Sequence, residues 1–290
     1  MKMMIFGAGF SGLAIARELA GECGFAGGTT RGPARFAALQ EAGLKPFIYE
    51  GGTPSEDLGA ALSEITHLVM SISPDASGDP LLEAFAAGLR RPMPKLEWIG
   101  YLSTVGVYGD HGGDWVDEET PCRPVSRRSV ARLAAEDGWT RLATEAGVPL
   151  AIIRLSGIYG PGRNALKTLD EGKARRLIKP GQVFNRIHVA DIGGATALLA
   201  RERLGGIYNV TDNMPAPPQD VVSRAAQVMG VEPPEETDFG IADLSPMARS
   251  FYGENKRVSN AKIKATGYDF RYPDYNAGLD ALYADGSWQG

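Results

Sequence analysis

Short apolar runs alternate with segments of helical composition along most of the chain. The apolar runs cover residues 3–7, a stretch around 24–27, 46–50, 68–72, 98–103 and 150–155, and glycine, proline or polar turn residues bound each one. Helical segments lie between them at residues 13–20, 33–42, 81–89 and 129–146. Continuous apolar strands separated by helices are typical of a parallel sheet that is covered on both faces. The pattern therefore predicts an α/β fold.

The alternation weakens toward the carboxyl end. Residues 213–218 are rich in proline and predict a loop, and residues 240–290 show weak periodicity with several aromatic side chains. We predict a Rossmann-type, doubly wound parallel sheet with a small C-terminal substrate lobe. Residues 1–155 and 182–213 would form the dinucleotide-binding domain. Residues 156–181 and 214–290 would form the lobe, and the two would make one continuous structural unit.

Composition narrows the function classes. The chain has 290 residues, 43% hydrophobic and 22% charged, with a formal net charge of -5, so nothing in its charge favours nucleic-acid binding. Its two cysteines and three histidines show no spacing typical of a disulfide framework or a metal site. No apolar run approaches the ~20 residues of a membrane span. We expect a cytoplasmic protein with no metal, no nucleic-acid partner and no membrane partner.

A glycine-rich loop follows the first apolar run. Its sequence is Gly7-Ala8-Gly9-Phe10-Ser11-Gly12, a G-x-G-x-x-G pattern with a strand predicted before it and a helix after it. The first glycine permits a tight turn, the second lets the backbone approach a diphosphate, and the third lets the helix pack closely on the strand. The free amides and the dipole of the helix N-terminus favour phosphate. This context predicts a dinucleotide site rather than an empty glycine turn.

The end of the second strand indicates which dinucleotide binds. NAD enzymes usually place an acidic residue there for the ribose 2′-hydroxyl, but no acid occurs between Glu22 and Glu41. Arg31 follows this strand, and its guanidinium can hold a 2′-phosphate with help from the hydroxyl of Thr29 or Thr30. We predict NADP as the cofactor. NAD, with Arg31 merely solvated, is the alternative.

Further segments resemble those of one known superfamily. Leu102-Ser103-Thr104-Val105-Gly106-Val107-Tyr108-Gly109 resembles the "SSxxVYG" signature of the extended short-chain dehydrogenases/reductases, which include nucleotide-sugar epimerases, dehydratases and reductases. In the same order as in that superfamily follow segments similar to "RxxxVYGPG", "IHVxDxA" and "GxYNv", at residues 154–162, 187–192 and 206–210. The resemblance covers most of residues 1–215.

The resemblance implies roles for individual residues. Thr104 would hydrogen-bond the reacting oxygen, although a strand-end hydroxyl bonded to backbone is the alternative. His188 would have a structural role, with its ring bonded to nearby backbone. Residues expected to contact the cofactor are Gly7, Gly9, Phe10, Ser11, Gly12, Thr30, Arg31, Glu50, Ser71, Leu102, Arg132 and Tyr159.

The superfamily's catalytic pair does not appear at the expected place. Its members use Tyr-x-x-x-Lys on the helix after the fifth strand, where the tyrosine exchanges a proton with the substrate and the lysine lowers its pKa. Counting back from Glu136, which matches an acid in the family pattern, places Arg128 and Arg132 at these positions. No tyrosine occurs between residues 108 and 159, and no lysine between 95 and 167. Arg132 can still hold a ribose or phosphate, but Arg128 stays protonated and cannot be a general base.

Two basic clusters flank the predicted substrate side. Clustered arginines at a cleft suit phosphate, whereas a solvated basic face is the equally weighted alternative. We expect Arg163 and Arg176 to contact a small, phosphorylated substrate. The clusters are Arg123, Arg127, Arg128 and Arg132, and Arg163, Lys167, Lys173, Arg175, Arg176 and Lys179.

Two functional hypotheses remain open. The first is an NAD(P)-dependent oxidoreductase or epimerase that acts on a nucleotide-sugar-like or small carbonyl or hydroxyl substrate, with an atypical active site. The second is a cofactor-binding sensor or regulatory module without turnover. The segment 129–146 resembles the helix through which family members form a homodimer, while burial of the same face against the chain's own sheet is the alternative.

Overall fold

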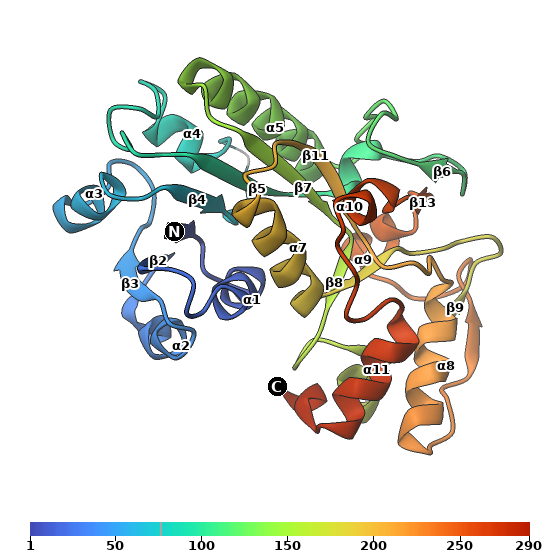
Figure 1. Cartoon of the computed structure of the whole chain (residues 1–290). Helices are drawn as coiled ribbons and strands as arrows, with labels where there is room; N and C mark the ends of the chain where they lie inside the picture. Colours follow the sequence, from blue (N-terminus) through green and yellow to red (C-terminus); the bar gives the residue numbers. More distant parts are fainter. Residues whose placement is uncertain (76) are drawn as a thin grey trace. The chain divides into compact units, whose positions relative to one another are not determined.

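A seven-stranded parallel sheet forms the centre of the fold (Figure 1). Its strands lie in the order β11-β7-β5-β4-β1-β2-β3 in this computed structural model, which describes residues 1–75 and 77–290, without the side chains of 246–248. The strands are β1 (Lys2–Phe6), β2 (Phe25–Thr30), β3 (Lys45–Ile48), β4 (His67–Met70), β5 (Trp98–Thr104), β7 (Leu150–Leu155) and β11 (Gly206–Val210). The chain runs outward from β1 to β3 and returns to β4 on the other side of β1. The topological switch point, where ligands of such sheets bind, therefore lies between β1 and β4.

Helices cover both faces of this sheet, which confirms the doubly wound fold (Figure 1). Alternate residues of β1 face opposite sides, and Met4 and Phe6 pack in one core cluster with side chains of α3, α4 and α5. On the other face α1 and α7 approach so closely that a Cβ on Gly193 would lie 2.8 Å from the Ala14 carbonyl oxygen. The helices are α1 (Phe10–Glu18), η1 (Pro33–Arg35), α2 (Phe36–Glu41), α3 (Glu56–Leu62), α4 (Pro80–Ala84), η2 (Val105–Tyr108), α5 (Arg127–Ala146) and α7 (Val189–Arg201).

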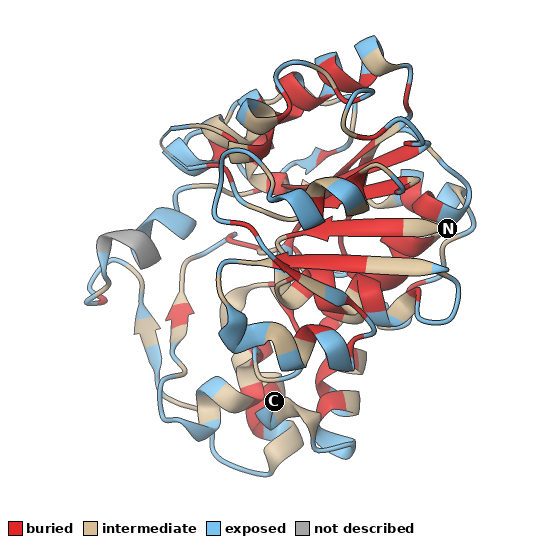
Figure 2. Cartoon of the chain, turned by 90° about the vertical axis from the view of Figure 1, so that its left-hand side faces the viewer, coloured by how far each residue is buried: buried red, intermediate tan, exposed pale blue. Residues whose placement is uncertain are grey.

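The strand cores follow the apolar runs of the sequence, but β2 and α4 end at other residues than expected. Figure 2 shows the sheet strands as largely buried. Strand β2 continues to Thr30 rather than ending near residue 27, because Gly27 and Gly28 leave room for Met4 and Leu44 to pack against its backbone. Helix α4 ends at Ala84 rather than near residue 89, and the chain turns at Gly88, whose φ is 102°.

The chain divides into two compact units. The first contains residues 1–107, 124–154 and 192–208, and the second contains residues 108–123, 155–191 and 209–290. We expected residues 108–123 in the dinucleotide-binding domain. They belong to the second unit, where the Asn255 amide donates to Asp110 and the Lys256 ammonium donates to the Gly109 carbonyl.

The second unit combines short parallel strand pairs with helices. Its core contains Tyr159, Leu166, Val221, Tyr275 and Leu279. The pairs are β8 (Gly157–Tyr159) with β10 (Arg186–His188), β9 (Arg176–Ile178) with β12 (Glu236–Asp238), and β6 (Trp115–Val116) with β13 (Arg257–Val258). Its helices are α6 (Ala165–Asp170), α8 (Pro218–Met229), α9 (Pro246–Phe251), α10 (Ala261–Ala265), α11 (Tyr275–Ala284) and η3 (Ser287–Gln289).

A buried ion pair fixes α5 to the sheet in the first unit. Glu136 of α5 pairs with Arg154 of β7 at 2.7 Å, and both side chains are nearly fully buried, at 3% and 4% exposed. The Ser103 hydroxyl at the end of β5 donates to the same carboxylate. Because three elements meet at one charge pair, this contact sets the position of the α5 N-terminal half relative to the ends of β5 and β7.

Replacing Glu136 should destabilise the protein more than replacing an exposed paired acid. Glu136→Gln leaves the Arg154 guanidinium buried without its counter-charge, so the free energy of unfolding should fall by about 3 kcal/mol or more. The control Glu97→Gln breaks an exposed pair with Arg203 and should cost about 1 kcal/mol or less. Urea unfolding monitored by circular dichroism measures both, and equal losses would contradict the anchoring role of Glu136.

Candidate functional site

The glycine loop closes against the end of β4. Gly7 has a φ of 78°, and a Cβ there would lie 2.8 Å from Cγ1 of Ile72 and 3.0 Å from its amide nitrogen. The Gly7 amide donates to the Thr29 hydroxyl at 2.9 Å, and the Ala8 amide donates to the Thr29 carbonyl oxygen. Glycine is thus required at position 7 both for its backbone conformation and for the close approach of two chain segments.

The N-terminus of α1 is uncapped and open. Gly9 is the N-cap residue, no side chain caps the helix, and its first turn contains no acid. A Cβ on Gly9 would meet only the Gly7 carbonyl at 3.8 Å and Arg35 at 3.9 Å, so the loop surface is open. Gly12 lies tightly over β1, where a Cβ would be 3.1 Å from Ile5. The first-turn amides around Phe10 and Ser11 are therefore left without a side-chain cap.

The end of β2 adds basic groups beside this loop. Thr30 ends the strand, and Arg31 follows as an exposed residue. Thr29, one of the two threonines expected to assist Arg31, is buried at 1% exposed, and its hydroxyl accepts a hydrogen bond from the Gly7 amide. Nη1 of Arg35, in η1, would lie 3.9 Å from a Cβ built on Gly9, and no motif in the sequence indicates this proximity. Glu50 is exposed and follows β3, the edge strand of the sheet.

Arg132 spans the carboxyl ends of β4 and β5. Its Nη1 donates to the Leu102 carbonyl at 2.8 Å and to the Tyr101 hydroxyl at 3.2 Å, and Nη2 donates to the Ser73 hydroxyl at 2.8 Å. Ser71 continues the β1–β4 pairing through its amide, which donates to the Phe6 carbonyl. The guanidinium is thus held at the carboxyl ends of β4 and β5, next to the switch point between β4 and β1.

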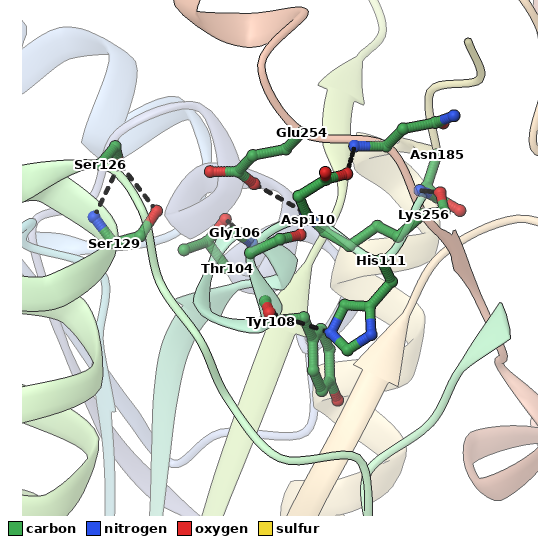
Figure 3. Close-up of polar contacts among 12 residues, drawn as sticks. Thr104, Gly106, Tyr108, Asp110, His111, Ser126, Ser129, Asn185, Glu254 and Lys256 are labelled. Carbon is green, nitrogen blue, oxygen red and sulfur yellow. Dashed lines mark hydrogen bonds and ion pairs between the residues drawn. The ribbon is translucent and has the colours of Figure 1, made fainter. Parts of the chain in front are cut away.

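Thr104 is the last residue of β5, at the carboxyl-end side of the sheet. Its hydroxyl oxygen accepts a hydrogen bond from the Gly106 amide at 3.1 Å, and the side chain is half-buried. Ser126 and Ser129 come from the start of α5, where the Ser126 hydroxyl accepts from the Ser129 amide and donates to the Ser129 hydroxyl at 2.9 Å (Figure 3). A Cβ on Gly106 would lie 2.7 Å from the Ser129 hydroxyl oxygen and 3.4 Å from that of Thr104.

Helix α5 carries no tyrosine and no lysine. Arg128, at the position expected for the tyrosine, is exposed in the first turn of the helix. Leu142 and Ala143 of α5 are buried in the core cluster of the sheet, while Val130 is 50% exposed. The apolar side chains in the carboxyl half of α5 are therefore buried against the chain's own sheet.

In the second unit, Tyr159 and His188 form one aromatic cluster with Tyr272. The Tyr159 ring meets His188 edge-on at 5.1 Å, and the His188 and Tyr272 centroids lie 4.0 Å apart. Nδ1 of His188 accepts from the Ala190 amide, which confirms the expected bond to backbone. Burial lowers the pKa of His188 to about 4, so the ring is neutral at physiological pH. Burial also raises the pKa of the Tyr159 hydroxyl, which donates to the Asp274 carbonyl at 3.4 Å.

A buried carboxyl group lies in the same unit. Asp212 is 1% exposed, its Oδ1 accepts from the Met214 amide, and its Oδ2 has no hydrogen-bond partner among the described residues. Burial raises the pKa of Asp212 to about 7, while the Met214 amide and the charge of Arg186 act in the opposite direction. No feature of the sequence around Asp212 distinguishes it from a surface loop aspartate.

The predicted substrate residues differ in their surroundings. Arg163 is exposed beyond β8. Arg176 of β9 forms an ion pair with Glu236 of β12 at 2.5 Å and donates to the Pro234 carbonyl. The other basic side chains of this cluster that bond to the chain include Lys167, Lys173 and Arg175. Within the described ranges, no group of histidine, cysteine and acidic residues is arranged to hold a metal ion. No described helix has the length and apolar character that a membrane span requires.

The buried Asp212 should make stability depend on pH in one defined window. Between its ordinary pKa of 3.8 and its folded value of about 7, the folded protein holds a proton that the unfolded chain has released. This contribution to stability is complete below pH 4 and is lost as pH rises through 7. Asp212→Asn has no carboxyl group to titrate, so the variant does not lose this stability. The unfolding free energy of the variant, relative to that of the native protein, should therefore rise from pH 4 to pH 7 by on the order of 4 kcal/mol at most.

Urea unfolding of both proteins at half-unit steps from pH 4.5 to 8 measures this difference. His188 is present in both proteins, so its opposite dependence, in which stability falls as pH drops toward 4, cancels in the subtraction. A difference that stays constant with pH would contradict the raised pKa of Asp212.

Comparison with known proteins agrees with this architecture. Residues 81–210 match the NAD dependent epimerase/dehydratase family. The chain is 28% identical to Protein YeeZ of Escherichia coli K12, over 94% of this chain and 97% of YeeZ. It is 44% identical to a conserved protein of unknown function from Silicibacter pomeroyi DSS, with a TM-score of 0.90 over 99% of both chains.

A more distant solved structure shares the fold. The human epimerase family protein SDR39U1, solved with NADPH, is 17% identical with a TM-score of 0.75, over 98% of this chain and 100% of that one. Residues 81–210 therefore match the NAD dependent epimerase/dehydratase family model, and the chain as a whole has a Rossmann-type fold that it shares with these solved structures.

Proposed function

We propose that this protein is an NADP(H)-dependent oxidoreductase or epimerase that acts on a carbonyl or hydroxyl carbon of a small, nucleotide-sugar-like substrate. The observation that carries the proposal is the open, uncapped N-terminus of α1 at Gly9. It lies at the carboxyl-end side of the sheet, where β5 also ends in Thr104. A site for a diphosphate and a hydroxyl for a reacting oxygen therefore belong to one compact unit. That combination suits hydride transfer between a dinucleotide and a substrate carbon.

The glycine loop and the end of β4 would hold the cofactor. The amides around Phe10 and Ser11 would bind its diphosphate, and Ser71, Leu102 and Arg132 would lie along its path past the switch point. When bound, the nicotinamide supplies or accepts a hydride. The chain's own part is to hold the diphosphate, to orient the ring, and to bind the oxygen on the substrate carbon.

Arg31 and Arg35 support NADP over NAD. Both are exposed, they are four residues apart in sequence, and Arg35 reaches the surface above Gly9. A guanidinium can hold a ribose 2′-phosphate with two parallel hydrogen bonds, and two guanidiniums can share its charge. SDR39U1, which has the same fold, was solved with NADPH.

Removing the two arginines should abolish the preference for the phosphorylated cofactor. A hydrogen bond to a charged group contributes about 1.5–3 kcal/mol, so each of Arg31→Ala and Arg35→Ala should weaken NADPH binding by about 10-fold to 100-fold. NADH affinity should stay within about twofold, because NADH lacks the 2′-phosphate. Calorimetric titration of native protein and variants measures this, with Arg203→Ala as a control because Arg203 pairs with Glu97 near the amino end of β5. Native protein that binds NADH as tightly as NADPH would reject this role.

Thr104 is the residue that we propose to bind the reacting oxygen. The Gly106 amide occupies one lone pair of its hydroxyl, which leaves the proton directed elsewhere. Because one donor to a developing oxyanion is worth about 100-fold to 1,000-fold in turnover, Thr104→Val should lower kcat by about that factor with little change in NADPH affinity.

NADPH oxidation with a panel of UDP-hexoses, UDP-hexuronic acids and 9,10-phenanthrenequinone is the assay. Equal rates of Thr104→Val and native protein would contradict the role of Thr104. The absence of turnover by native protein that binds NADPH would instead support the alternative of a cofactor sensor, which the family match over residues 81–210 does not favour.

A phosphate on the substrate is supported by one exposed arginine. Arg163 follows β8 in the second unit and is open to solvent, whereas Arg176 is already paired with Glu236. Arg163 is therefore the better candidate for contact with a nucleoside diphosphate, and Arg176 would have to exchange its partner first.

A further inference from the structure

Two hydroxyl groups face the same side of Gly106 in the first unit. The nearest atoms to a Cβ built on Gly106 are the hydroxyl oxygens of Ser129, at 2.7 Å, and of Thr104, at 3.4 Å. Ser129 comes from the first turn of α5, one residue after Arg128, and is 7% exposed. The helix position next to the one expected for the family's tyrosine thus directs a hydroxyl toward the turn that follows Thr104.

The hydroxyl protons of Thr104 and Ser129 are both available to donate. The Thr104 oxygen accepts from the Gly106 amide, and the Ser129 oxygen accepts from the Ser126 hydroxyl. Neither the Thr104 nor the Ser129 hydroxyl donates to another described residue. A hydroxyl carries one donor and two acceptor positions, so each can still donate to an oxygen placed beside Gly106.

The Ser129 hydroxyl is also connected to solvent. Ser126 is exposed, and its hydroxyl donates to Ser129 at 2.9 Å (Figure 3). A proton that leaves Ser129 can therefore be replaced from Ser126, which in turn is replenished from water. The Ser126–Ser129 hydrogen bond thus connects an exposed hydroxyl to a buried one, and the buried one lies on the same side of Gly106 as the Thr104 hydroxyl.

We propose that Ser129, resupplied through Ser126, is the proton donor to the reacting oxygen and acts beside Thr104. This inference rests on the proposed function and names the group that does the work of the missing tyrosine. In the reduction, the hydride adds to the carbonyl carbon and the π electrons move to the carbonyl oxygen. The Ser129 proton passes to that oxygen, the Ser126 proton passes to Ser129, and one solvent proton restores Ser126. One carbonyl, one hydride and one proton give one alcohol.

A purely structural role for Ser129 would have a different signature. The cap of α5 is the bond from the Ser129 backbone amide to the Ser126 hydroxyl, and Ser129→Ala keeps it. Loss of the Ser129 hydroxyl should therefore leave the melting temperature within a few degrees of native. Loss of Ser126 removes the cap as well, so Ser126→Ala should lower the melting temperature more than Ser129→Ala does.

Gly106→Ala offers a second variant that acts through the same hydroxyl. A methyl group at Gly106 would meet the Ser129 oxygen at 2.7 Å, and this oxygen lies at the end of a short side chain that can rotate. Gly106 is not among the glycines with positive φ, so alanine introduces no backbone strain. The variant should fold normally with the Ser129 hydroxyl turned away from Thr104.

The test compares native protein with Ser129→Ala, Ser126→Ala, Gly106→Ala and the control Thr144→Ala. Four quantities are measured for each protein: the melting temperature, the calorimetric NADPH affinity, and kcat and KM with the best substrate of the panel. Thr144 lies on α5, and its hydroxyl bonds only to its own helix. We expect kcat to fall about 100-fold in Ser129→Ala and Gly106→Ala, and about 10-fold in Ser126→Ala because water can replace that hydroxyl. NADPH affinity should stay within about twofold in all variants, since none of these groups is placed at the cofactor.

Each outcome decides the proposal. Native protein that fails to bind NADPH overturns the proposed function and this inference with it. Native protein that binds NADPH and reduces a substrate, with Ser129→Ala or Gly106→Ala equally active, overturns only the role of Ser129. Native protein that binds NADPH without any turnover overturns both the proton path and the catalytic function. If Ser129→Ala binds NADPH so much more weakly that this explains its lower kcat, Ser129 acts in cofactor binding and the proposed role as proton donor is wrong.

Discussion

The close approach of the β1 and β4 ends is the constraint on which the rest of the site depends. Gly7 turns the chain at a φ of 78° directly against Ile72. The Gly7 amide donates a hydrogen bond to the hydroxyl of Thr29 in the neighbouring strand β2. Any side chain at position 7 would push these segments apart. Because this turn determines where α1 begins, it also determines where the uncapped helix N-terminus points. The open surface above Gly9 is a consequence of that packing.

A second constraint places the hydroxyl group of Ser129 next to the carboxyl end of β5. The ion pair between Glu136 and Arg154, with Ser103 as a third partner, holds α5 against β5 and β7 in the buried interior of the first unit. One turn before Glu136, Arg132 bonds to the Leu102 carbonyl, and the first turn of the helix brings Ser129 to Gly106. The helix start thus presents polar groups to the end of β5 even though it carries neither tyrosine nor lysine.

The sequence could predict the features that depend on local pattern. Continuous apolar strands, the order of the elements and the G-x-G-x-x-G turn follow from period and composition, and the structure confirms the fold that they indicate. Strand β2 was harder to place because Gly27 and Gly28 lower its apparent hydrophobicity, although both are buried against Met4 and Leu44. Their burial depends on side chains far away in sequence.

Features that depend on long-range partners could not be predicted. Thr29 and Arg35 differ in role because one is enclosed by the glycine loop and the other lies above it, which no spacing in the sequence shows. The same holds for Ser129, which shares a turn of α5 with exposed arginines, and for Asp212, whose buried state comes from the core of the second unit. A sequence signal for Arg35 is that it is a second arginine four residues after Arg31, at the end of the short η1 that follows β2.

Hydrogen–deuterium exchange of the backbone amides, with and without saturating NADPH, tests the central claim most directly. If the turn at Gly7 presents the start of α1 to a diphosphate, the amides of residues 9–12 should exchange more slowly with the cofactor, more than those at the amino ends of the strands near Lys2, Thr66 and His67. Unchanged exchange at residues 9–12, or protection confined to the amino ends of the strands, would contradict the account.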